Sequence, residues 1–265
     1  MHGDSILATS KSVRRGADRP APSRADVPAS SLLPLGAERV DAELGGGLKG
    51  DGLHEFYAAR TEDGIGALGF ALGLARRALA RDARPLLWLR LSRGPAARAV
   101  PYGPGLAELG LPPNRLTLLL LPDGKALLRA ALDAVRSGAP GAVLLDLEGP
   151  CPLLDLTASR RLTLAAEETG TMVLMVRGGA RPVPSAAHSR WEVAAAPSPL
   201  REGDVPGGPA FALTLLRHRG GRDGFACTVA WDRDGGMFRE TERQESEAPA
   251  SLSFLPAAAN DRKAG

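Results

Sequence analysis

The stretch GLHEFYAARTEDGIGALGFALGLARRALA, residues 52–80, decides the fold. It begins with a short, mostly apolar run at 52–58, which predicts a strand, and a glycine-containing loop follows. Apolar residues then recur at i, i+4, i+7 and i+11, the spacing of one face of a helix. These residues are Leu68, Leu72, Ala75 and Leu79. A strand, a glycine-containing loop and a helix in this order occupy the place of a phosphate-binding loop.

Downstream of this stretch, apolar runs of strand length alternate with helical patterns. The runs are PLLWLRL (85–91), RLTLLLL (115–121), GAVLLDL (141–147) and TMVLMVR (171–177). Helices are expected at 104–110, around Leu128 to Val135 with Gly138 at the end, and from a cap at Thr157 to Gly170. Strands that are apolar throughout and alternate with amphipathic helices indicate a parallel sheet covered on both faces.

The last third of the chain differs, because its strands have no helices between them. The expected strands are SRWEVAAA (189–196), AFALTLLRHR (210–219) and FACTVAWD (225–232). The segment RHRGGRDG (217–224) predicts the turn region of an antiparallel hairpin. The sequence therefore predicts an α/β fold, in which a mostly parallel sheet flanked by helices is extended by antiparallel C-terminal strands.

Composition indicates the size of the folded domain and limits what can be inferred about its partners. The chain has 265 residues, 44% of them hydrophobic, which is enough for one sizeable core. We expect the folded domain at 31–239, because the tails at 1–30 and 240–265 are too poor in apolar residues to offset the entropy of ordering and are predicted to be disordered. The balance of 33 basic against 30 acidic side chains does not by itself indicate nucleic-acid binding.

Cysteine usage and hydropathy exclude several further classes. Cys151 and Cys227 lie far apart and form no CxxC or Cys/His cluster, so we expect neither a disulfide framework nor a metal site. No apolar run approaches the roughly 20 residues that span a bilayer. The N-terminal residues lack the apolar core of a secretory signal. We therefore expect a cytoplasmic protein without membrane contact.

The phosphate-loop position lacks the residues that handle nucleotide. A working loop has the pattern GxxxxGK[ST], whose lysine neutralises phosphate charge and whose hydroxyl holds magnesium. With Gly64 as the second glycine, Ile65 occupies the lysine position and Gly66 the hydroxyl position, while Glu62 and Asp63 lie in the loop. At about 5 Å and an effective dielectric near 20, each like-charge pair costs on the order of 3 kcal/mol. With no cation expected to balance these carboxylates, we predict that the chain binds no nucleotide cofactor and is not an enzyme.

The strand VLLDLEG has the form of a Walker B strand that ends in Asp146. A carboxylate at this place would act on a nucleotide-bound metal. Without nucleotide, the favoured interpretation is structural, with Asp146 hydrogen-bonded to local backbone.

Several motifs resemble known proteins. LPLGAERVDAELGGGLKGDGLHEFYA (33–58) resembles the opening of the RecA core. TASRRLTLAAEETGTMVLMVR (157–177), SRWEVAAAPS (189–198) and LLRHRGG (215–221) are more specifically similar to ImuA, the RecA-like family of bacterial damage-inducible mutagenesis cassettes. The resemblance covers about residues 32–236 and implies a RecA-like core.

The same resemblance implies a role and partners. Members of the ImuA family are associated with ImuB, a Y-family polymerase homologue, and with the alpha subunit of an error-prone C-family DNA polymerase. Together they are thought to copy past damaged bases during the SOS response. The resemblance thus implies a non-catalytic accessory protein that scaffolds or regulates this complex, with RecA as a further partner and weak contact to DNA.

Basic residues in three segments are candidate contacts for DNA or a partner. Residues 178–191 occupy the position of the second DNA-binding loop of RecA-like folds, and the segment after the Walker-B-like strand leads toward such loops. Arginines beside glycines in a hairpin end could also contact phosphates. The candidates are Arg160, Arg161, Arg177, Arg181, Arg190, Trp191, Arg217, Arg219 and Arg222. For each a structural role is the competing interpretation, and for Trp191 a place in the core is favoured.

Two other functions remain open at this stage. One is a RecA-type DNA-dependent ATPase with an atypical phosphate loop, which micromolar, magnesium-dependent ATP binding would favour. The other is a cell-division inhibitor of the SulA type, a non-ATPase relative of RecA that caps the FtsZ polymer, which FtsZ binding would favour.

Overall fold

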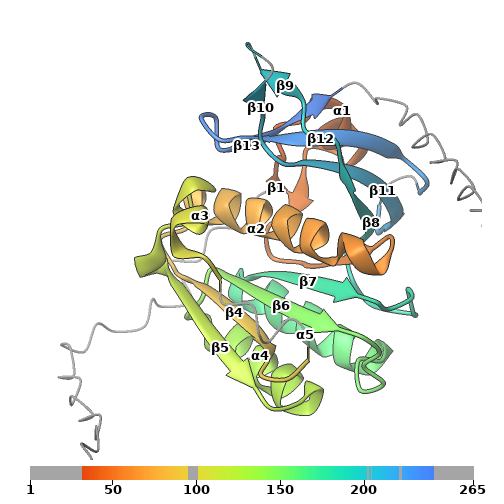
Figure 1. Cartoon of the computed structure of the whole chain (residues 1–265). Helices are drawn as coiled ribbons and strands as arrows, with labels where there is room; N and C mark the ends of the chain where they lie inside the picture. The colour runs from red at the N-terminus through yellow and green to blue at the C-terminus, as the bar shows by residue number, and fades with distance from the viewer. Residues whose placement is uncertain (1–31, 95–100, 202, 204, 221–222, 242–265) are drawn as a thin grey trace, which may run out of the picture.

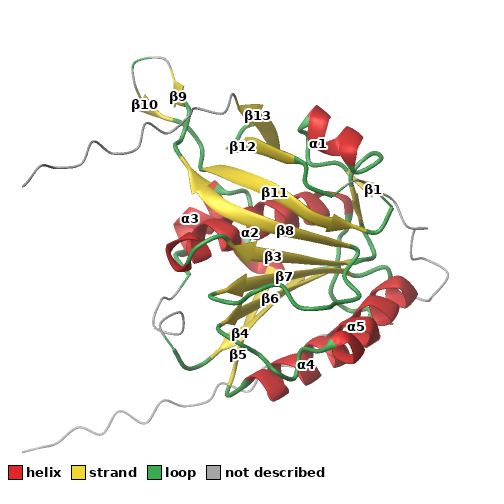
Figure 2. Ribbon diagram, turned by 90° about the vertical axis from the view of Figure 1, so that its right-hand side faces the viewer, coloured by secondary structure: helices red, strands yellow, loops and turns green. Residues whose placement is uncertain are grey.

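The computed structural model describes residues 32–94, 101–201, 203, 205–220 and 223–241. The predicted tails, 1–30 and most of 240–265, lie outside these residues, as does Arg222. One large sheet organises the described part of the chain (Figures 1 and 2). Its nine strands, in spatial order, are β13 (Met237–Thr241), β12 (Ala226–Asp232), β11 (Ala210–His218), β8 (Ser189–Ala196), β3 (Leu53–Ala58), β7 (Met172–Gly178), β6 (Ala142–Glu148), β4 (Leu86–Leu91) and β5 (Leu116–Leu121).

The directions of the strands confirm the predicted fold class. The six strands from β8 to β5 pair in parallel, whereas β11, β12 and β13 extend the sheet antiparallel. Two short antiparallel pairs lie outside the large sheet among the described residues. They are β1 (Leu32–Leu33) with β2 (Leu48–Lys49), and β9 (Leu200–Arg201) with β10 (Val205–Pro206).

Helices cover both faces of the parallel strands. Helix α2 (Gly64–Arg81) lies on one face, and its buried Phe70 and Leu74 join a core that includes Phe56 and Trp191. Helices α4 (Gly124–Ser137) and α5 (Leu156–Thr169) lie together on the other face (Figure 2). The shorter elements are α1 (Glu38–Glu43), α3 (Gly103–Glu108) and the 3-10 turns η2 (Thr61–Asp63) and η4 (Pro113–Arg115).

The C-terminal ends of α4 and α5 lie where the sequence predicted them, whereas the N-terminal cap of α5 differs from the prediction. Gly138 and Gly170 end α4 and α5 in the left-handed conformation, with φ of 63° and 64°, which favours glycine. The predicted cap at Thr157 is wrong, because the side chain of Asp155 accepts the hydrogen bond from the Ala158 N–H. A carboxylate two residues earlier thus satisfies the free N–H groups of the first turn.

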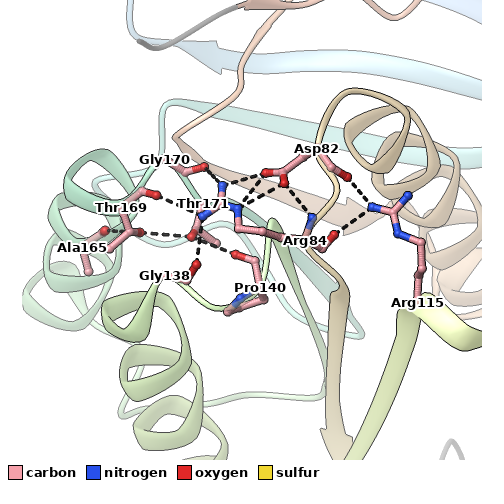
Figure 3. Close-up of polar contacts among 9 residues, drawn as sticks. All are labelled: Asp82, Arg84, Arg115, Gly138, Pro140, Ala165, Thr169, Gly170 and Thr171. Carbon is pink, nitrogen blue, oxygen red and sulfur yellow. Dashed lines mark hydrogen bonds and ion pairs between the residues drawn. The ribbon is translucent and has the colours of Figure 1, made fainter. Parts of the chain in front are cut away.

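We call the edge of the sheet where the parallel strands begin the amino edge, and the edge where they end the carboxyl edge. At the amino edge, two arginines bind the ends of several elements (Figure 3). Arg84 donates to the carbonyls of Gly138 (3.0 Å), Thr169 (3.2 Å) and Gly170 (2.7 Å), and its Nη2 lies 2.7 Å from the Asp82 carboxylate. Arg115 donates to the carbonyls of Leu79, Asp82 and Arg84. These bonds fix α4 and α5 to the same point of the sheet.

Candidate functional site

The phosphate-loop position is a compact turn closed by Asp63. Strand β3 ends at Ala58, η2 follows, and α2 begins directly at Gly64. The Asp63 side chain is 2% exposed, and it accepts hydrogen bonds from the N–H of Ala195 on β8 (2.9 Å) and of Arg60 (3.1 Å). The loop's own carboxylate therefore binds backbone N–H groups and attaches the loop to the neighbouring strand.

The expectation that no cation balances the loop carboxylates is wrong. Arg60 Nε lies 3.3 Å from Asp63 Oδ2 and 3.4 Å from Glu62 Oε1. Arg60 lies in the same turn as the two carboxylates, and its positive charge compensates their negative charge. The lysine and hydroxyl positions of a working loop hold Ile65 and Gly66 in this chain. Ile65 is 84% exposed, and Gly66 lies against the backbone of Ala195.

Asp146 forms an ion pair across two strands. It is the register partner of Arg90 on β4, and Arg90 Nε lies 3.3 Å from Asp146 Oδ2 with both side chains nearly buried. The Arg90 guanidinium also lies 5.4 Å from the centre of the Trp88 ring. Burial raises the pKa of Asp146, and the charge of Arg90 acts in the opposite direction. The predicted structural role thus has a different partner from the local backbone that we expected.

A groove opens at the carboxyl edge, between the connections that follow β6 and β7. Its volume is about 730 Å³, and its walls come from residues 150–156 and 179–184. The lining is mostly apolar, with three prolines and three aliphatic side chains, and its charged members are two arginines and one carboxylate. These residues are Pro150, Pro152, Pro184, Leu154, Leu156, Val183, Arg177, Arg181 and Asp155.

Arg177 lines this groove and is itself almost fully buried. It is 3% exposed, and its Nε and Nη1 have no hydrogen-bond partner among the described residues. Its guanidinium carbon lies 5.7 Å from the centre of the Tyr57 ring, on the neighbouring strand. A buried cation with two unsatisfied donors is energetically costly. The charge of nearby Glu55 offsets part of this cost.

Glu55 lies on the same face of β3 as Tyr57, two residues earlier, and is also buried. Its carboxylate accepts hydrogen bonds from Ser185 Oγ (2.6 Å) and Tyr57 Oη (3.0 Å). Burial raises the pKa of Glu55, while these two bonds and the charges of Arg177 and Arg190 act against that rise. Sequence reasoning missed this carboxylate, although a glutamate in an otherwise apolar strand was a visible signal.

The structure places three of the predicted arginines at opposite ends of α5. Arg177 and Arg181 line the groove with the first turn of α5. Arg219 contacts the last turn, where its Nη1 lies 3.9 Å from Glu167 Oε1, and Arg217 pairs in register with Arg190. A 14-residue helix is about 20 Å long. Arg177 and Arg181 therefore lie at the opposite end of α5 from Arg219.

Of the remaining candidate residues, two are exposed, one bonds a backbone carbonyl and one lies in the core. Arg160 and Arg161 are exposed on α5. Arg190 donates to the Val183 carbonyl at 2.9 Å. Trp191 is 1% exposed, and its Nε1 donates to Ser189 Oγ at 2.8 Å, which confirms the favoured core role.

Three histidines that lie far apart in the sequence, His54, His188 and His218, converge near the amino edge. The ring of His188 lies 5.9 Å from that of His54 and 5.1 Å from that of His218. His54 Nδ1 and Nε2 are bonded to Ser189 Oγ and the Lys49 carbonyl. Burial lowers the pKa of His54 to about 3 and of His188 to about 4.

Comparison with known proteins gives a family and a fold. No family model matches the chain. The chain is 35% identical over 207 residues to Protein ImuA from two strains of Caulobacter vibrioides, NA1000/CB15N and ATCC 19089, covering 73% of this chain and 81% of each relative. It is also similar to the crystal structure of the RadB recombinase, with a TM-score of 0.52 and 14% identity over 80% of this chain and all of RadB. This second likeness shows the fold alone and confirms a RecA-like core. Among the described residues, no helix combines the length and hydrophobicity needed to cross a membrane.

Proposed function

This chain belongs to the ImuA family, and on that premise we propose that it is a non-catalytic RecA-like accessory protein of SOS-induced translesion DNA synthesis. It scaffolds or regulates a cytoplasmic complex of ImuB with the error-prone C-family polymerase alpha subunit. RecA is a further partner, and any contact with DNA is weak.

The observation that carries the absence of catalysis is the closed phosphate loop. The Asp63 carboxylate accepts from the N–H groups of Arg60 and Ala195, the kind of donors that would face phosphate oxygens in a nucleotide site. The lysine and hydroxyl positions hold Ile65 and Gly66. Asp146 is paired with Arg90, so a metal would have to compete with a buried guanidinium.

Nucleotide binding tests this proposal directly. A fluorescent ATP analogue titrated into the full chain with magnesium should show no saturable binding below the millimolar range, and purified protein should not hydrolyse ATP. Micromolar, magnesium-dependent binding together with hydrolysis that Asp146→Asn abolishes would establish the ATPase alternative instead.

A restored loop sharpens the same test. The double variant Ile65→Lys with Gly66→Thr supplies the missing lysine and hydroxyl, and a Cβ at position 66 would make only ordinary contact with Ala195, at 3.5–3.6 Å. We expect no gain of ATP binding, because Asp63 still closes the turn. Adding Asp63→Ala to this double variant separates the effect of the missing cation from the effect of the closed loop.

The partners are tested in damaged cells. Affinity-tagged full-length chain should co-purify with ImuB and the polymerase alpha subunit after DNA damage, and deletion of its gene should reduce damage-induced mutagenesis. Co-purification with FtsZ instead would favour the cell-division inhibitor.

A further inference from the structure

We propose that the groove at the carboxyl edge binds a short extended peptide, whose carboxylate pairs with Arg177 and whose aliphatic side chains pack on the proline and leucine walls. The peptide belongs to a partner protein, so the inference rests on the proposed accessory function and names the chemistry by which that partner is recognised.

Arg177 supplies the first step of the argument. Two other arginines, the partly buried Arg84 and the buried Arg90, each have a carboxylate within 3.3 Å. Arg177 is more buried than Arg84, yet its Nε and Nη1 have no hydrogen-bond partner among the described residues, and the side chain lines an open groove. An anionic group in the groove would be attracted by this buried positive charge, which the folded chain leaves with two unsatisfied donors.

Glu55 does not fill this role. Its two oxygens accept from Ser185 Oγ and Tyr57 Oη, and the structure gives it no ion pair with Arg177. The nearby Arg190 directs its Nη1 to the Val183 carbonyl. Arg177, Arg190 and Glu55 form a cluster behind the groove. This cluster has one more cation than anion. The charged residues of the lining itself, Arg177, Arg181 and Asp155, also sum to one net positive charge.

The walls favour a peptide over nucleic acid. Prolines and aliphatic side chains form most of the lining, and Leu156 at the start of α5 is 54% exposed. A phosphate backbone needs a track of cations, whereas the groove lining has only two arginines, Arg177 and Arg181, and one of them is almost fully buried. The planar guanidinium fork matches a single carboxylate. A volume of about 730 Å³ lies in the range of small-ligand sites and holds a few residues.

Peptide selection on the full chain tests the proposal. Phage-displayed random heptapeptides are selected on the wild-type protein and counter-selected on Arg177→Met. We expect the enriched peptides to share one Asp or Glu flanked by aliphatic residues. A fluorescein-labelled synthetic copy should bind on the order of 30-fold or more tightly than its Gln or Asn version, and Arg177→Met should remove that difference.

Two further variants separate recognition from folding. Leu156→Glu places a like charge on an exposed wall position and should weaken the peptide at least tenfold. Arg129→Met removes an arginine of α4 that lies outside the groove lining and whose side chain is 85% exposed, and it should leave binding unchanged. Thermal unfolding of all three variants checks that each one is folded.

Several results would overturn the proposal. They are enriched peptides without a carboxylate, equal peptide affinity of Arg177→Met and wild type, or an Arg177→Met variant that loses single-stranded DNA binding but keeps the peptide. The two proposals fail separately. If gene deletion leaves damage-induced mutagenesis unchanged, the accessory function fails while the measured peptide binding stands. If no carboxylate peptide is selected, the groove inference fails while a mutagenesis phenotype stands.

Discussion

Two arginines lie at opposite edges of one sheet, Arg84 partly buried and Arg177 almost fully buried, and their surroundings differ. At the amino edge, Arg84 donates to the carbonyls that end α4 and α5 and lies against Asp82 (Figure 3). At the carboxyl edge, Arg177 lies in the wall of a groove, and its Nε and Nη1 have no partner among the described residues. The first arginine joins elements of the fold, and the second is suited to a ligand that the fold does not supply.

The largest expected effect comes from removing the Arg84 contacts at the amino edge. Arg84→Met should lower the free energy of unfolding by about 2–4 kcal/mol, because it removes the guanidinium from the partly buried Asp82 carboxylate and from three carbonyls. Urea denaturation measures this change. A loss below about 1 kcal/mol would mean that water replaces Arg84 as the donor to the carbonyls at the helix ends. The arginines at the two edges would then differ less in their contribution to stability than their hydrogen bonds suggest.

A second effect tests the buried histidines near the same edge. The pKa of His54 is lowered to about 3 from an ordinary value of 6.5, so below pH 6.5 the unfolded state binds a proton that the folded state does not. The contribution of His54 is fully present above pH 6.5 and is lost as the pH falls. We expect a loss of about 2–3 kcal/mol between pH 6.5 and 4.5.

Chemical denaturation across this pH range measures that loss, and His54→Gln provides the control. Burial raises the pKa values of Glu55 and Asp146, which has the opposite sign and stabilises the folded state as the pH falls. The difference between wild type and His54→Gln isolates the histidine. Parallel pH profiles for the two proteins would contradict the prediction.

A third change concerns the carboxyl edge. Arg177→Met should leave the free energy of unfolding within about 1 kcal/mol of wild type, because the loss of a buried cation with two unsatisfied donors offsets the loss of its attraction to Glu55. The same denaturation experiment compares it with Arg84→Met. If Arg177→Met destabilised the chain as much as Arg84→Met, Arg177 would have a structural role and the contrast between the two edges would disappear.

The smallest change sets the baseline for these measurements. Arg129 is exposed on α4, and its Nε lies 3.9 Å from Asp133 Oδ2 in an i,i+4 pair. Because such surface pairs contribute about 0.3–0.5 kcal/mol, Arg129→Met should change the unfolding free energy by no more than about 0.5 kcal/mol. A larger value would show that loss of arginine stems alone contributes to the other two variants.

Most of the sheet could be predicted from the sequence. The segment 189–196 coincides with β8, and the run at 141–147 lies within one residue of β6 at each end. The pattern did not reveal β13 at Met237–Thr241, a short strand that gains its stability from pairing with β12 and from the packing of Phe238 on α2. Its last two residues lie beyond the predicted domain boundary at 239.

The candidate site was predicted only in part. Arg177 and Arg181 were named from their position in the chain, and both line the groove. Glu55, Ser185 and Leu156 were not named, because nothing local marks a carboxylate in β3 as the neighbour of a loop 130 residues away. Arg177 and Arg181 also lie at the opposite end of α5 from Arg219, which sequence spacing alone does not determine.

By itself, the sequence determined the periodicity of strands and helices, the glycines that end α4 and α5, and the absence of a lysine and a hydroxyl at Ile65 and Gly66. These are local properties, because burial period and turn conformation depend on residues within a few positions of one another. Only the tertiary structure decided which charges meet. Asp63 bonds the backbone of Ala195, 132 residues away, while Arg177 is left facing a groove. Charge pairing depends on the order of strands in the sheet, and that order emerges only when the whole chain has packed.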